Sequence, residues 1–258
     1  MTEPKSRMLA LFRKGDVVPA RGAKTASGLD LLGTKTQALT LPPPVAALPE
    51  PAALPARAVF GFDGTASREK TWKAAKQTTD SLLSAIPGEL EVALAVHGGG
   101  RLHTYTPFTA NPAKLRDLAA RVKCQAGETR LNDIMLRVLE EPRVSVVIYI
   151  GDMFEESEEH AQRIAKMLKQ QNTRLIILHD RGTVHDVEIE YAASVFKKLA
   201  ALTGGAVLPF DIAALARLRE TLAAIAVLAV GGTSMLAAKQ ATMPAARLLL
   251  EHLKDGTT

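Results

Sequence analysis

The chain has 258 residues, of which 47% are hydrophobic, and a formal net charge of +5 at pH 7. This length and composition predict a soluble globular protein with one ample domain plus extensions. The single cysteine, Cys124, excludes an internal disulfide and a cysteine cluster for zinc or iron–sulfur, so a reducing cytoplasm is the expected compartment.

The first 57 residues differ in composition from the rest of the chain. They contain eight of the fourteen prolines, and their eight Lys or Arg against four Asp or Glu supply +4 of the net charge. We expect residues 1–57 to form a basic, proline-rich, disordered tail and linker. The remaining residues are close to neutral, which argues against a basic face for binding nucleic acid.

Beyond this tail, short apolar runs alternate with amphipathic segments. The predicted strands are 58–63, 90–97, 102–108, 144–150, 174–179 and 207–210, and the predicted helices are 68–86, 112–122, 131–139, 158–169, 188–202, 212–230 and 244–253. Strands separated by helices predict an α/β fold, Rossmann-like and doubly wound. We expect a mostly parallel sheet with one antiparallel edge hairpin, from the second and third strands, and helices on both faces.

The longest uncharged apolar stretch is 221–238, and its length approaches that of a membrane span. It is rich in alanine and interrupted by Gly231 and Gly232, so we expect a buried helix and no membrane span. The chain start has no apolar run of signal-peptide length before Arg13 and Lys14, which agrees with a cytoplasmic location. We divide the folded part into a domain at 58–232 and a C-terminal helical extension at 233–258.

Oxygen-bearing side chains follow or precede three of these elements. Asp63, Thr65 and Ser67 come directly after the first strand, Thr129 precedes the 131–139 helix, and Asp152 follows the 144–150 strand. In open α/β sheets, ligands bind at the carboxyl ends of the strands. Alternation within Asp-x-Thr-x-Ser lets its three side chains converge. Two carboxylates with three hydroxyls suit a hard cation that keeps bound water, chiefly Mg²⁺, with Mn²⁺ or Ca²⁺ as alternatives.

This set of motifs resembles the von Willebrand factor A domain family over roughly residues 57–230. The family's marks are Asp-x-Ser/Thr-x-Ser after the first strand, a Thr in a later Gly-x-Thr turn, and an Asp after the central strand. Here Thr65 stands where Ser is commoner, and the central strand ends Ile-Gly-Asp-Met rather than Thr-Asp-Gly, which puts the shape of the loop after Asp152 in doubt.

The resemblance implies a metal-ion-dependent adhesion site, or MIDAS, formed by Asp63, Thr65, Ser67, Thr129 and Asp152 directly or through water. In that family the site is not catalytic, and a carboxylate of a partner protein fills an open position on the metal. The expected function is therefore a non-enzymatic protein–protein interaction module, with another protein offering an Asp or Glu as its partner. The short, Ala- and Leu-rich style of the chain favours a bacterial origin.

Two alternative functions remain open. The segment Phe62-Asp63-Gly64-Thr65 also resembles the Asp-x-Asp-Gly-Thr motif of haloacid-dehalogenase phosphatases, but the position of their nucleophile is occupied by Gly61. A scaffold protein with a vestigial metal site would act instead through its tails, namely the proline-rich segment 41–57 or the apolar helix around Leu248. Binding that survives loss of the metal ligands would favour the scaffold.

Overall fold

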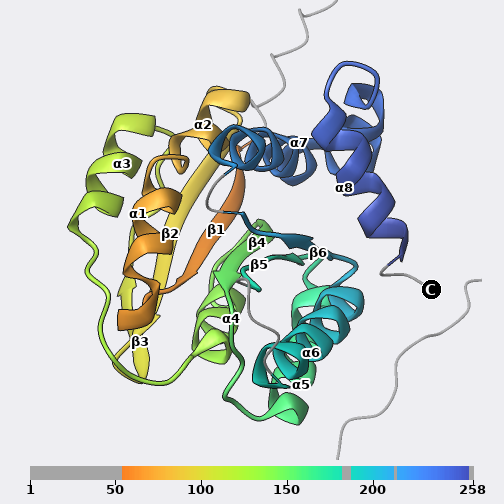
Figure 1. Ribbon diagram of the computed structural model, residues 1–258. Helices are drawn as coiled ribbons and strands as arrows, with labels where there is room; N and C mark the ends of the chain where they lie inside the picture. The colour runs from red at the N-terminus through yellow and green to blue at the C-terminus, as the bar shows by residue number, and fades with distance from the viewer. Residues whose placement is uncertain (1–53, 182–186, 212–213, 256–258) are drawn as a thin grey trace, which may run out of the picture. The chain divides into compact units, whose positions relative to one another are not determined.

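The computed structural model describes residues 54–181, 187–211 and 214–255. Most of the predicted tail, 1–57, therefore lies outside the described residues. The described part contains one sheet of six strands in the order β3-β2-β1-β4-β5-β6 (Figure 1). The strands are β1 (Ala56–Asp63), β2 (Leu90–Gly98), β3 (Arg101–Tyr105), β4 (Val144–Gly151), β5 (Arg174–His179) and β6 (Ala206–Pro209).

All neighbouring strands run parallel except β2 and β3, which form an antiparallel hairpin at one edge. The chain winds outward from β1 in both directions, first to β2 and later to β4, so the strand order reverses between β1 and β4. In β1 and β4 every residue from the third onward is buried, as expected for strands covered on both faces. The predicted doubly wound, mostly parallel fold is confirmed.

The helices form a layer on each face of this sheet (Figure 1). One buried cluster joins residues of α1, α2, α3, α7 and α8 to Phe60 and Phe62 of β1, and the other joins α4, α5 and α6 to Val59. The helices are α1 (Glu69–Lys76), α2 (Asp80–Ala85), α3 (Pro112–Arg121), α4 (Leu131–Leu139), α5 (Glu158–Gln170), α6 (Val187–Thr203), α7 (Leu215–Lys239) and α8 (Pro244–Asp255).

The observed bounds agree closely with the predicted ones for α4 and β5, whereas α7 runs nine residues beyond the predicted end at 230 and one predicted helix is divided. A single helix over 68–86 does not form: a 3₁₀ turn, η1 (Ala66–Arg68), is followed by α1 and α2 with a break between them. The hydroxyl groups of Thr78 and Thr79 donate to the carbonyls of Ala75 and Lys76 at this break. Such local bonds compete with the helical ladder and favour a turn.

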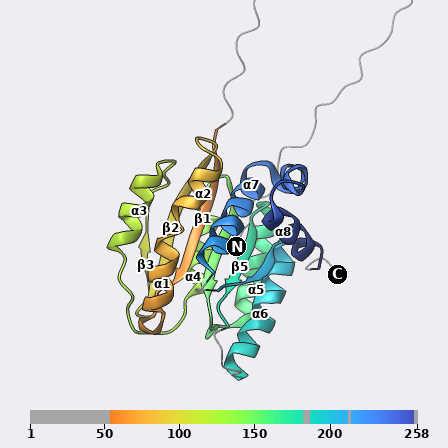
Figure 2. The ribbon, with the colours of Figure 1, turned by 45° about the horizontal axis from the view of Figure 1, so that its top comes forward.

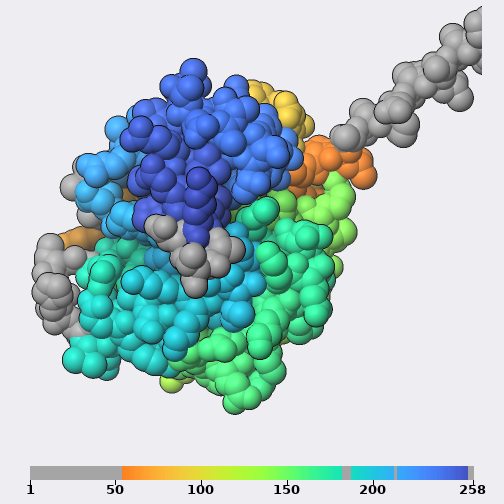
Figure 3. Space-filling view, turned by 90° about the vertical axis from the view of Figure 1, so that its right-hand side faces the viewer, coloured from red at the N-terminus to blue at the C-terminus, as the bar shows by residue number. Residues whose placement is uncertain are grey.

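The C-terminal helices pack on the same domain. α7 continues to Lys239 through Gly232, whose φ of 63° interrupts the helical geometry. α8 lies beside α7 (Figure 2), and its surface borders that of α6 in Figure 3. By length and composition α7 could cross a membrane, and it is the one described helix of which this is true. Its buried residues, such as Leu222 and Ile225, belong to the domain core, which agrees with the predicted buried helix.

Candidate metal site

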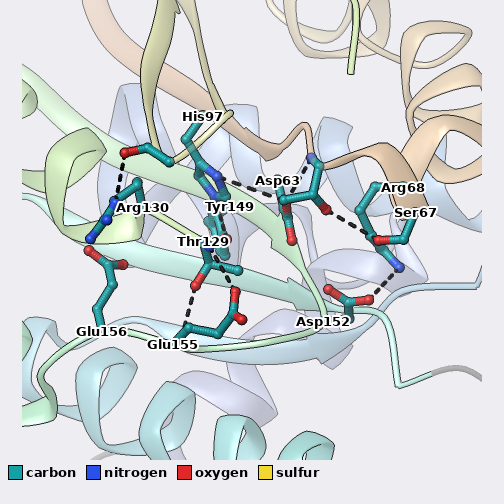
Figure 4. Close-up of polar contacts among 12 residues, drawn as sticks. Asp63, Ser67, Arg68, His97, Thr129, Arg130, Tyr149, Asp152, Glu155 and Glu156 are labelled. Atoms are coloured by element: carbon teal, nitrogen blue, oxygen red, sulfur yellow. Dashed lines mark hydrogen bonds and ion pairs between the residues drawn. The ribbon is translucent and has the colours of Figure 1, made fainter. Parts of the chain in front are cut away.

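The candidate site lies where the strand order reverses. Asp63 is the last residue of β1, and Asp152 directly follows β4, the strand paired with β1. A crevice at the carboxyl ends of two such strands is the usual ligand position in open α/β sheets. Figure 4 shows Asp63, Ser67, Arg68 and Asp152 gathered at this edge, with Thr129 and Glu155 beside them.

A close backbone contact fixes the turn that follows Asp63. The amide of Gly64 donates to the His97 carbonyl at 2.8 Å, which ties this turn to the end of β2. A Cβ at Gly64 would lie 2.6 Å from Val96 Cγ1 and 2.8 Å from the His97 carbonyl oxygen. The position therefore needs glycine for close approach, and the contact directs the following residues back over the strand end.

The turn brings three oxygen groups together. The amide of Thr65 donates to Asp63 Oδ1 at 3.0 Å, and the hydroxyl oxygens of Thr65 and Ser67 lie 3.3 Å apart. Asp63 is 1% exposed, yet its Oδ2 has no hydrogen-bond partner in the described part of the chain. A buried carboxylate oxygen left unpaired is costly and calls for a cation or a water at that point.

Thr129 approaches from the loop before α4 and is tied to the loop after β4. Its amide donates to Glu155 Oε2, and its hydroxyl oxygen accepts from the Glu155 amide, both at 2.9 Å. Thr129 is buried, and these two bonds hold its hydroxyl beside the Asp152 loop (Figure 4). Glu156 accepts from the amide of Asn132 in the first turn of α4, so the same loop also caps that helix.

A second close glycine contact positions the Thr129 loop from its other side. A Cβ at Gly127 would come within 2.6 Å of Gly99 Cα, so this loop packs backbone to backbone on the β2–β3 turn. Arg130 reinforces the contact by donating to the Gly100 carbonyl at 2.9 Å. The turn between the second and third predicted strands therefore supports the loop that carries Thr129.

Arg68 extends the site in a way that the motif does not specify. Its guanidinium group donates to Asp152 Oδ2 at 3.0 Å and to Asp180 Oδ2 at 2.8 Å. Asp180 follows β5, the next strand along, and also accepts from the Thr71 hydroxyl at 3.2 Å. A buried arginine thus joins the loops after β1, β4 and β5.

Both acidic candidates bind protons more tightly than free carboxylates. Burial raises the pKa of Asp63, against the lowering effect of the Thr65 amide and hydroxyl and of the Arg68 charge. Burial also raises the pKa of Asp152 to about 6, with Arg68 lowering it and the nearby Asp63 raising it. Burial disfavours the charged form of both carboxyl groups, and a positive charge beside them favours it.

A neutral polar pair lies beneath Asp63. His97, at the end of β2, is paired with Asp63 in the strand register, and its Nδ1 lies 3.8 Å from Asp63 Oδ1. Its Nε2 lies 2.8 Å from the Tyr149 hydroxyl. Burial lowers the pKa of His97 to about 3 and raises that of Tyr149 well above its usual value. Both groups are therefore neutral at physiological pH, so His97 lies near Asp63 without neutralising its charge.

The donor set fits a hard divalent cation. No group of three or more His, Cys, Asp and Glu side chains placed to hold a metal occurs in the ranges that the structure describes. A cation here would depend on hydroxyl oxygens as well as carboxylates, which is the chemistry of Mg²⁺ or Mn²⁺ rather than zinc in a structural site. The unpaired Oδ2 of Asp63, beside the Thr65 and Ser67 hydroxyls, supplies the position for it.

The structure links three of the five predicted ligands by hydrogen bonds and places the other two beside them (Figure 4). Asp63, Thr65 and Ser67 are linked by hydrogen bonds, and Asp152 is close enough to Asp63 that each affects the pKa of the other. Thr129 joins the same edge through Glu155. The sequence reasoning did not identify Arg68 or His97 as parts of the site. The position of Arg68 next to Ser67 was the one available signal.

Comparison with known proteins agrees with this architecture. No protein-family model and no curated protein matches the chain. Among solved structures, a von Willebrand factor type A protein from Catenulispora acidiphila matches with a TM-score of 0.52 and 18% identity, over 66% of this chain and 42% of that one. The described domain therefore has the von Willebrand factor A fold, which confirms at the level of the fold the resemblance seen in the motifs.

Two further structures illustrate the range of proteins with a similar fold. Proximal thread matrix protein 1 from the mussel byssus, with a zinc-occupied MIDAS motif, has a TM-score of 0.53 and 16% identity, over 66% of this chain and 45% of that one. An aerotolerance-related membrane protein from Bacteroides fragilis NCTC 9343, carrying multiple mutations to serines, has a TM-score of 0.50 and 14% identity. The match covers 65% of this chain and 98% of that one. The chain thus spans less than half of the Catenulispora and mussel chains.

Proposed function

We propose that this domain is a metal-dependent protein-interaction module. Asp63, Thr65, Ser67, Thr129 and Asp152 would hold one divalent cation, directly or through water, with Mg²⁺ as the expected ion. The bound cation supplies an open coordination position for an Asp or Glu of a partner protein. The site has no enzymatic role in this proposal, and the partner meets the domain in the cytoplasm.

One observation carries this proposal. Asp63 Oδ2 is buried and without a hydrogen-bond partner in the described residues, beside two hydroxyls that lie 3.3 Å apart. A site that served only the fold would be expected to satisfy this oxygen from within the protein. Ser67 is exposed, so the site faces solvent on the side from which a partner would approach. The mussel protein with a zinc-occupied MIDAS supports a divalent cation on this fold.

Metal binding is tested by isothermal titration of Mg²⁺ and Mn²⁺ into the full chain. We expect binding by the native protein and none by an Asp63→Ala/Asp152→Ala variant. Asp117→Ala is the matched control, because Asp117 is exposed on α3 and outside the site. Native protein that binds neither ion would contradict the proposal.

The open coordination position has its own test. Mn²⁺ that keeps an exchangeable water enhances the relaxation rate of solvent protons, whereas Mn²⁺ enclosed by protein oxygens does not. We expect enhancement for the Mn²⁺-loaded native protein. Bound Mn²⁺ without enhancement would leave no place for a partner carboxylate, and the interaction part of the proposal would fail.

A further inference from the structure

Arg68 places a positive charge of the protein itself at the candidate metal site. Its side chain is 8% exposed, and it pairs with Asp152 at 3.0 Å and Asp180 at 2.8 Å. It follows Ser67 directly, so the loop that carries the hydroxyls also carries this cation. Figure 4 shows the Arg68 head group directed at Asp152 from the side of Asp63 and Ser67.

The geometry makes the pairing a fixed feature. Both terminal nitrogens of the guanidinium group are used, one on each carboxylate, and Asp180 is further held by the Thr71 hydroxyl. A buried guanidinium group cannot lose its proton, so its charge must be matched by these carboxylates. Asp152 Oδ2 is therefore already paired with a cation when no metal is bound.

A divalent ion at the predicted position would need the same carboxylate. Asp152 would then lie between the metal and Arg68, and the two positive charges would repel each other in a partly buried setting where screening by solvent is weak. Asp180, whose carboxylate Arg68 also contacts, gives the guanidinium group a second anchor that does not depend on Asp152. Metal binding and the Arg68–Asp152 pair thus oppose each other at one carboxylate.

We propose that Arg68 is a tethered competitor of the metal ion, which lowers the affinity of the site for divalent cations by holding Asp152. This inference rests on the proposed function, since it assumes that the site binds a metal. It adds that metal occupancy depends on how strongly the Arg68 guanidinium group holds Asp152 against the metal ion. A partner carboxylate that coordinates the metal would then favour the metal-bound form.

The test compares Mn²⁺ affinity in the full-length native protein, Arg68→Met and Arg68→Gln, by isothermal titration. Removing the charge is expected to raise the affinity by about tenfold or more. Arg68→Gln keeps a hydrogen-bond donor toward Asp152 and serves if the methionine variant does not fold, as judged by circular dichroism. Arg116→Met removes an equal charge from an exposed pair with Asp80 on α2 and α3, and should leave the affinity unchanged.

The outcomes separate this inference from the proposed function. If the native protein binds Mn²⁺ and both folded Arg68 variants bind it no more tightly, the competition is refuted while the metal site stands. If the variants bind and the native protein does not, the competition is supported in its strongest form, and the native chain is not metal-dependent. If native protein and variants alike fail to bind, both proposals are overturned. Adding Asp63→Ala to Arg68→Gln should abolish any gain.

Discussion

The imidazole of His97 and the hydroxyl of Tyr149 lie 2.8 Å apart, and both are fully buried beneath Asp63. The pair comes from β2 and β4, the two neighbours of the strand that ends in Asp63. It is therefore a buried polar pair next to the site, and neither of its residues is a predicted metal ligand.

Tyr149→Phe should weaken both the fold and the site. It removes the hydroxyl that pairs with His97 Nε2 and leaves a buried nitrogen without a partner, at a cost of about 1–3 kcal/mol. Urea denaturation measures this loss. Metal affinity should fall by less than in Asp63→Ala, because no ligand is removed. An unchanged midpoint would show that the pair contributes nothing to stability.

Gly64→Ala should destabilise the domain by steric overlap rather than by backbone strain. The added methyl group would lie 2.6 Å from Val96 Cγ1 and 2.8 Å from a carbonyl oxygen, which predicts a loss of about 1–3 kcal/mol. Gly100→Ala is the comparison, since its φ of 72° is strained but no atom lies within 4 Å of the new Cβ. Thermal unfolding should show the larger shift for Gly64→Ala, and the reverse order would contradict the assignment.

Thr129→Val tests the contribution of the Thr129 hydroxyl group while keeping the shape of the side chain. The variant loses the acceptor for the Glu155 amide and the predicted metal oxygen at nearly constant volume. We expect a stability loss of roughly 1 kcal/mol and weaker Mn²⁺ binding in titration. Thr129→Ser, which restores the hydroxyl, should recover most of both. Equal Mn²⁺ affinity in the valine variant would remove Thr129 from the ligand set.

Glu156 should give the domain a pH-dependent stability. Burial raises its pKa to about 7, so the folded state holds a proton that the unfolded state releases near pH 4.5. The contribution of this group to stability is present below pH 4.5 and is lost as the pH rises through 7. Glu156→Gln should therefore gain stability relative to the native protein between pH 5 and 8, by on the order of 2 kcal/mol. Urea denaturation of both proteins at several pH values measures this gain. A difference in stability that stays constant from pH 5 to 8 would contradict the prediction.

The fold was predictable from the sequence because its signals are local. The apolar run of β4 and the periodicity of α4 define elements without reference to the rest of the chain. The break after α1 was missed because it depends on threonine hydroxyls bonding to the backbone, which periodicity does not register.

The site was predictable only in part, because its additional residues act across the sheet. Asp63 and Asp152 stand at strand ends, where alternation of strands and helices already places them near each other. Arg68 is 84 residues from Asp152 and 112 from Asp180, and His97 is 52 from Tyr149. No spacing rule links such positions, so their pairing emerges only when the strand order is known.

The position of β1 in the middle of the sheet bears on how the chain is made. β1 and β2 can pair once residue 98 has emerged from the ribosome, but the other edge of β1 must wait for β4, which ends at Gly151. An apolar strand would meanwhile present unpaired backbone groups on the ribosome, a state prone to aggregation. We expect nascent chains that end between these points to depend on chaperones, and chains that extend past β4 to become protease-resistant.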